Sequence, residues 1–100
     1  MYRGVRKLNI RAESIWLDLG EEVHAYAEVT CGEKVPFVVR DAKYVFIDPE
    51  GNIEAQGMCE VDGHRLDVFL TPQMAGDYKL KYTYKVADET WVDVVKVKVR

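Results

Sequence analysis

The stretch from Tyr78 to Val86 constrains this chain more than any other, because apolar and polar side chains alternate along it without a break. Successive side chains of a β-strand point to opposite faces of its sheet, so the alternation predicts a strand with one buried face and one solvated face. The predicted solvated face carries the lysines of this stretch. The predicted buried set is Tyr78, Leu80, Tyr82, Tyr84 and Val86.

A corner is predicted directly before this strand, where Pro72 is followed by Gly76-Asp77-Tyr78. In immunoglobulin-like sandwiches, a tyrosine at the start of the sixth strand donates or accepts a hydrogen bond with backbone a few residues upstream. We therefore expect Gly76 and Tyr78 to form a structural corner, with the Tyr78 hydroxyl bonded to backbone near Pro72 to Met74.

The rest of the chain divides into further short alternating segments separated by turn residues. The segment 8–19 changes its apolar parity at Glu13-Ser14, which predicts a kink between two sheets. Gly57 is a candidate bend or sheet-switch point within 53–61, and Asp62-Gly63 predicts a tight hairpin. Segments 23–31, 42–48, 66–70 and 91–99 predict strands, 35–39 predicts an edge segment, and 48–52 predicts a type I turn. The fold class predicted is all-β, an immunoglobulin-like antiparallel β-sandwich of seven to eight strands.

Length and charge restrict the classes of function. One hundred residues suit a single domain, which we expect to span residues 1–100. A net charge of −3 argues against a general nucleic-acid binder, whose domain is normally basic. No uncharged apolar run approaches the ~20 residues of a membrane helix, and the N-terminal residues lack the apolar core of a signal peptide. We therefore expect no nucleic-acid or membrane partner. We also expect a protein that stays inside the cell that makes it, or one whose leader has been removed.

The sequence shows no motif typical of a catalytic or metal-binding site. Cys31, Cys59, His24 and His64 would supply a zinc site, but neither pair has the short spacing that lets one loop offer two ligands. Ser14 is the single serine, and nothing around it resembles a nucleophile elbow. Glycine-rich phosphate loops are absent, and the carboxylates alternate on strands or lie in turns. We expect no catalytic residues, no metal and no cofactor.

The two cysteines leave an alternative open. Cys31 and Cys59 are both predicted on inward faces of neighbouring strands, so a disulfide would form if their Cα atoms lie within about 7 Å. Two cysteines are nevertheless too few for a disulfide scaffold. Buried free thiols are the favoured interpretation.

Basic residues gather on the predicted solvated faces of two adjacent strands. Lys79, Lys81 and Lys85 share one strand face, and a second strand contributes Lys96, Lys98 and Arg100. Such a patch would dock an acidic partner surface. The alternative interpretation, which the pattern favours, is that lysines on sheet faces and edges discourage aggregation because they are costly to desolvate.

The segment 42–48 is apolar on both faces, so one set of its side chains must remain uncovered in an isolated domain. We expect Tyr44 and Phe46 to point inward. The outward apolar side chains together with the nearby lysines then make the candidate interface. Its residues are Val45, Ile47, Val92, Val94, Lys79, Lys81, Lys96 and Lys98.

Three stretches carry a resemblance to a known family: GEEVHAYAEV, VPFVVRDAKYVFIDPEGN and RLDVFLTPQMAGDYKLKYTY. Together they resemble the immunoglobulin-like domains of tailed-bacteriophage structural proteins, in particular the N-terminal domain of baseplate upper and fibre proteins. Corresponding parts are the apolar segment 35–39, the strand 42–46, the turn Pro49-Glu50-Gly51 and the Gly76-Asp77-Tyr78 corner. Antibody domains differ, because Leu80 stands where they have the second disulfide cysteine.

The resemblance implies a non-enzymatic virion structural or assembly module of a phage or prophage, made in the bacterial cytoplasm and located in the virion. Its partners would be other virion proteins or a second copy of itself. The alternative is a ligand-binding or adhesion module of a bacterial surface protein, acting through end loops such as 50–52 and 88–90.

Overall fold

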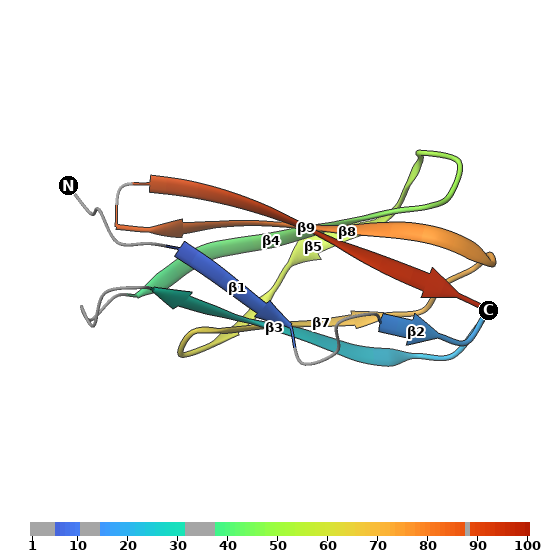
Figure 1. Cartoon of the computed structure of the whole chain (residues 1–100), viewed down its shortest axis with the longest axis horizontal. Helices are drawn as coiled ribbons and strands as arrows, with labels where there is room; N and C mark the ends of the chain where they lie inside the picture. Colours follow the sequence, from blue (N-terminus) through green and yellow to red (C-terminus); the bar gives the residue numbers. More distant parts are fainter. Residues whose placement is uncertain (1–5, 11–14, 32–37, 88) are drawn as a thin grey trace.

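The computed structural model describes residues 6–10, 15–31, 38–87 and 89–100 and shows two sheets packed face to face (Figure 1). The four-stranded sheet has the order β1-β3-β7-β6 and the five-stranded sheet the order β2-β9-β8-β4-β5. The strands are β1 Arg6–Ile10, β2 Ile15–Leu17, β3 Val23–Cys31, β4 Val39–Ile47, β5 Ile53–Met58, β6 Glu60–Asp62, β7 Arg65–Leu70, β8 Gly76–Val86 and β9 Glu89–Val99. The predicted immunoglobulin-like sandwich is confirmed.

The chain changes sheets early. β1 pairs antiparallel with β3 in one sheet, whereas β2 pairs parallel with β9 in the other. A first strand divided between two sheets is what the parity change of the segment 8–19 predicted. The kink at Glu13-Ser14 itself lies outside the described residues, as does the part 35–37 of the predicted edge segment 35–39. Val39, the last residue of that segment, belongs to β4 and pairs with β8, so its assignment to an edge is wrong.

The chain changes sheets a second time between β5 and β6, and this change lies at Cys59 instead of Gly57. Gly57 continues the β4–β5 ladder opposite Tyr44. The Cys59 N–H still donates to the Ala42 carbonyl at 2.9 Å, and the next residue, Glu60, already pairs with Asp67 of β7. Gly57 therefore serves as a small residue beside the Tyr44 ring, which a Cβ at this position would meet at 3.5 Å.

Strand β4 begins three residues earlier than the sequence predicted. Val39 pairs with Val86, and the register with β8 then shifts between Arg40 and Lys43. Asp41 takes a positive φ of 51° at this bulge. The extra residue explains why Val39 and Ala42 are both buried although they stand three positions apart.

The core confirms the alternation of β8. All five residues of its predicted inward set are buried, and Phe46 stacks on Tyr78 with ring centroids 4.3 Å apart. Facing them from β3 and β7 are the small and branched side chains Ala25, Ala27, Val29, Leu66, Val68 and Leu70. Small alanines on one sheet thus accommodate tyrosines of the other.

The corner and the turn after β4 also agree with the sequence. The Met74 N–H donates to the Tyr78 hydroxyl at 3.1 Å, as predicted. Gly76 has a φ of 131°, and a Cβ there would lie 2.7 Å from Cγ of Pro49, so the corner requires glycine. The turn after β4 closes with the Gly51 N–H donating to the Asp48 carbonyl at 3.0 Å. The β6–β7 hairpin turns through Gly63 and His64, one residue later than predicted.

Candidate docking face

The eight predicted interface residues all lie on the outer face of the five-stranded sheet, which we call the docking face. Directly opposite residues of an antiparallel pair share a face, and the registers place Val45 beside Lys81 and Lys81 beside Val94. In the next row, Ile47, Lys79 and Lys96 stand side by side. The strands β4, β8 and β9 therefore bring together side chains that are more than fifty positions apart in the sequence.

Apolar groups of the docking face are open to solvent. Val92 is 44% exposed and Val94 is 56% exposed, whereas Val45 and Ile47 are half-buried by their neighbours. The half-burial of Val45 and Ile47 follows from their central strand, since lysines on β8 flank both of them. The long lysine stems cover apolar surface while their ammonium groups stay in water.

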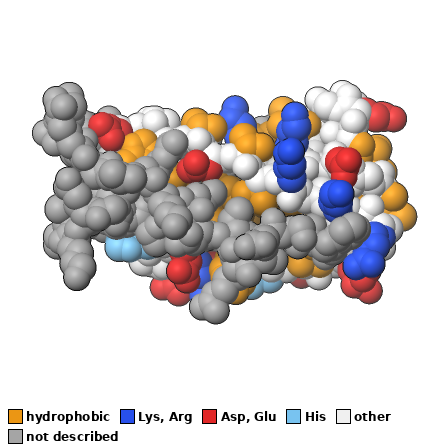
Figure 2. All heavy atoms as spheres, in the orientation of Figure 1, with side chains coloured by type: hydrophobic (Ala, Val, Ile, Leu, Met, Phe, Trp, Pro, Cys, Tyr) orange, Lys and Arg blue, Asp and Glu red, His pale blue; other side chains and the backbone are white. Residues whose placement is uncertain are grey.

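The charge of the docking face is strongly positive. Lys43 lies in the row of Thr83 and Val92 and adds a fifth lysine that the sequence analysis did not include. Among the described residues of these rows, Asp77 supplies the single carboxylate, opposite Lys98. No described carboxylate forms an ion pair with Lys79, Lys81 or Lys96. Figure 2 shows the result along the upper side of the molecule, where basic side chains stand among hydrophobic ones.

One lysine of the predicted basic patch differs from the others in its surroundings. Lys85 lies beyond Thr83, opposite Thr90, and its Nζ is 3.9 Å from Oδ2 of Asp41. Arg40, which pairs with Lys85, donates to the Ala87 carbonyl at 2.5 Å and so caps the β8–β9 turn. Lys85 and Arg40 thus lie at the end of the sandwich, one row beyond Thr83, and Lys85 differs from Lys79, Lys81 and Lys96 in having a carboxylate beside it.

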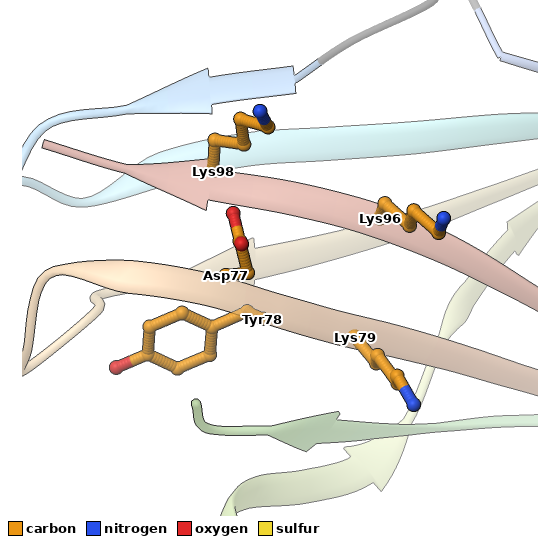
Figure 3. A pocket seen from close by; sticks show the side chains of 5 residues that line it. All are labelled: Asp77, Tyr78, Lys79, Lys96 and Lys98. Carbon is orange, nitrogen blue, oxygen red and sulfur yellow. The ribbon is translucent and has the colours of Figure 1, made fainter. Parts of the chain in front are cut away.

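A shallow hollow of about 280 Å³ lies at the other end of the docking face (Figure 3). It is lined by Asp77, Tyr78, Lys79, Lys96 and Lys98. In Figure 3, Asp77 and Lys98 lie near one another on the adjacent strands β8 and β9, and Lys79 and Lys96 lie further along the same strands. The Tyr78 ring turns away from Asp77, toward the core. Three lysines around one hollow favour a partner side chain that ends in a carboxylate.

The outer face of the four-stranded sheet carries a different cluster. The Asp67 side chain is only 7% exposed because His24 and Arg65 cover it. Its Oδ1 lies 2.6 Å from Nε2 of His24, and its Oδ2 accepts from Nε of Arg65 at 3.1 Å. His24 in turn stacks on Phe69 with ring centroids 4.8 Å apart.

The polar groups of this cluster bond to one another. The hydrogen bond that Arg65 donates to Asp67, together with the negative charge of Asp67, raises the pKa of Arg65, so the guanidinium stays charged. Arg65 also lies 5.6 Å from the centroid of the Tyr26 ring. The alternation with Leu66, Val68 and Leu70 puts Asp67 and Arg65 on the outward face of the strand, but it does not predict the burial of Asp67. A buried carboxylate that is paired in this way holds β3 and β7 together.

Cys59 is a free, buried thiol. Burial raises its pKa to about 12, and the negative charge of Asp67 adds to the effect. A thiol with such a pKa stays protonated at neutral pH and is a poor nucleophile or metal ligand. The Cys31 side chain lies outside the described residues, and so does Ser14.

Among the described residues, no three His, Cys, Asp or Glu side chains come together as potential metal ligands. Within the same part of the chain, no helix has the length and apolar character that crossing a membrane requires.

No protein-family model matches this chain, and no curated protein matches it. Solved structures resemble it at low sequence identity. The chain superposes on an engineered protein with a TM-score of 0.73 at 12% identity, covering 98% of itself and 20% of that protein. It superposes on CopC from Methylosinus trichosporium OB3b with a TM-score of 0.63 at 10% identity, covering 97% and 93%.

A third similarity is to the complex of titin M10 with an immunoglobulin domain of obscurin-like 1. The TM-score is 0.51 at 18% identity, and the similarity covers 98% of this chain and 96% of that one. The chain spans about a fifth of the engineered protein but nearly the whole of the other two. These likenesses concern the fold, and they agree with the strand order in describing an immunoglobulin-like β-sandwich.

Proposed function

We propose that this domain is a non-enzymatic protein-interaction module that binds an acidic partner protein through the docking face. The observation that carries the proposal is the register, which places exposed valines directly beside lysines that have no ion-pair partner among the described residues. On this face the lysines of β8 stand between the apolar side chains of β4 and those of β9, so a partner meets apolar and basic groups side by side. Each valine buried by a partner contributes roughly 1.5–3 kcal/mol, and the lysines accelerate the approach of a negatively charged surface.

The charge of the face argues against a face-to-face dimer. Two copies stacked by this surface would oppose five lysines to five lysines, with one Asp77 on each side to offset them. Like charges brought together at an interface cost several kcal/mol. A different protein, with carboxylates around an apolar patch, complements the face instead.

A more specific form of the proposal places the domain in the virion of a tailed bacteriophage or prophage, where it joins structural subunits. The support for this form is the sequence resemblance in the stretches 20–29, 35–52 and 65–84, together with the small sandwich that such subunits share. Mass spectrometry of particles purified after prophage induction tests it. Presence of the chain at a constant ratio to the tail proteins is expected, and its exclusion from intact particles would contradict the virion role.

The docking face itself can be tested by nuclear magnetic resonance with a short peptide in which glutamate and leucine alternate. Chemical-shift changes are expected on the outward residues of β4, β8 and β9, and higher salt should weaken them. Val94→Glu and Lys96→Glu should both reduce binding, the first by replacing an exposed apolar side chain with a negative charge and the second by reversing a positive charge.

Lys85→Glu is the matched control, because it makes the same charge change on the same sheet outside the docking face. Equal losses for Lys85→Glu and Lys96→Glu would show that net charge alone governs binding. Shift changes centred on His24 and Arg65 would place the binding surface on the opposite sheet. Either result would refute the proposal.

A further inference from the structure

Strand β5 forms an outer edge of the five-stranded sheet. It pairs with β4 on one side, and no described strand pairs with it on the other. Both ends of this edge are apolar and open to solvent, since Ile53 is 58% exposed and Met58 is 66% exposed. An uncovered edge presents a row of backbone N–H and C=O groups that can pair with another chain.

Proteins usually protect such an edge by keeping the edge strand short or by placing charged residues or proline in it. β2 and β6 have only three residues each, and the sequence of β1 begins with Arg6 and Lys7. β5 has six residues and contains no lysine, arginine or proline. Its one charged residue, Glu54, accepts the hydrogen bond of the Tyr78 hydroxyl at 2.5 Å and so is held toward the corner.

The hydrogen-bond pattern shows which backbone groups of β5 face outward. Cys59 donates to Ala42 of β4, so these two residues form a hydrogen-bonded pair in a register that continues through Tyr44 and Gly57. Hydrogen-bonded and non-bonded pairs alternate in an antiparallel ladder. Gly57 and Ala55 therefore point their N–H and C=O groups toward β4, whereas those of Gln56 point away from the sheet.

We propose that two copies of this domain associate through their β5 edges, antiparallel about a two-fold axis at Gln56. In this register Gln56 faces its own counterpart, and each donates its outward N–H to the carbonyl of the other. Ala55 of one copy then lies opposite Gly57 of its partner, and these small residues leave the approach free of side-chain clashes. Residue parity agrees with the hydrogen-bond pattern, because opposite residues share a face.

Several features favour a second copy of this domain as the partner of the β5 edge. The register is self-complementary at Gln56, and the edge has no uncommitted charge that would repel itself. Edge-to-edge pairing also joins the two five-stranded sheets side by side, so the lysines of the two docking faces point in the same direction and never oppose one another. The dimer is independent of the proposed function, and it would present two docking faces to one partner assembly.

Sedimentation equilibrium of the whole chain over a range of concentrations tests the pairing. The parent is expected to dimerise. Gln56→Pro removes the outward N–H without disturbing the bonds to β4, and should weaken the dimer roughly tenfold or more through two lost hydrogen bonds. Gln56→Ala keeps the N–H and is the control, with a dimer dissociation constant near that of the parent. Circular dichroism of each variant verifies that the sandwich is intact.

A charge exchange tests the register. Gln56→Lys and Gln56→Glu each place like charges opposite one another at the axis, and each should weaken its homodimer about fivefold. An equal mixture of the two should recover the dimer as a heterodimer, because lysine then faces glutamate. A monomeric parent, or a dimer that Gln56→Pro and the charge variants leave unchanged, would overturn the proposal.

Discussion

The hydroxyl of Tyr78 joins parts of the chain that are distant in sequence. It accepts the Met74 N–H at 3.1 Å and donates to Oε1 of Glu54 at 2.5 Å. The same carboxylate accepts the Gln73 N–H at 3.3 Å. One tyrosine thus fastens the loop before β8 to the start of β5. Burial and the bond to Glu54 raise the pKa of Tyr78, so the hydroxyl remains a donor at neutral pH.

Replacing Tyr78 with phenylalanine should therefore destabilise the domain by about 1–3 kcal/mol, because the Met74 N–H and the Glu54 carboxylate each lose a partner. Urea denaturation of the parent and Tyr78→Phe measures the difference. Tyr44→Phe is the control, since its half-exposed ring should tolerate loss of the hydroxyl within about 0.5 kcal/mol. A Tyr78→Phe curve that overlays the parent would show that the corner bond is dispensable.

The sequence predicted the hydrogen bond between the Tyr78 hydroxyl and upstream backbone, but it did not predict the hydrogen bond to Glu54. A tyrosine after Gly76 indicates a bond to nearby upstream backbone, because that motif is local. Glu54 lies twenty-four positions away, and its direction depends on the extra residue that shifts the β4–β5 register between Phe46 and Ile47. Asp67 was missed for a similar reason, since its cover comes from His24 on another strand.

Among the elements, β4 depends on a bulge in its first half. Asp41 adopts a φ of 51° there, in the left-handed region, and lets both Val39 and Ala42 reach the core. The sequence predicted two separate segments here, an edge segment at 35–39 and a strand at 42–48. Two apolar residues three positions apart between strand-like segments are the signal that would have predicted one bulged strand.

Asp41→Val should destabilise the domain by about 1–2 kcal/mol, because a branched side chain is strained at positive φ. Asp41→Asn should stay within about 0.5 kcal/mol of the parent, since asparagine adopts this conformation readily. Thermal unfolding of both variants gives the comparison. Equal stability of the valine and asparagine variants would indicate that β4 can pair with β8 without this bulge.

At the scale of the whole molecule, the sequence predicted the fold because alternation is a local pattern. The apolar residues within each strand indicate which face of that strand is buried. It also predicted which valines and lysines point outward. It could not predict how β4, β8 and β9 align, and this alignment determines that Val94 stands beside Lys81 and that Lys85 stands apart. Nor could it predict that β5 is an edge, since strand order depends on long-range pairing.

Stability in alkaline solution depends on several buried groups at once. Burial, assisted by the charge of Asp67, raises the pKa of Cys59 from 9.0 to about 12. Burial is also the main cause that raises the pKa of Tyr82 and of Tyr78. In each case the folded chain holds its proton more tightly than the unfolded chain. The stabilisation is complete below the unfolded pKa and is lost as pH rises through the folded value.

We therefore expect the free energy of unfolding to stay level between neutral pH and about pH 8.5 and then to decrease toward pH 12. Above the unfolded pKa of the thiol, Cys59 alone contributes a slope of at most about 1.4 kcal/mol per pH unit. Urea midpoints at successive pH values measure the curve for the parent and for Cys59→Ala. The alanine variant should lose the part of the slope that begins near pH 9 and keep the part above pH 10, where tyrosine ionisation of the unfolded chain takes over. A parent whose stability rises from pH 9 to 10, or a Cys59→Ala curve parallel to that of the parent, would show that the thiol is not buried in the folded domain.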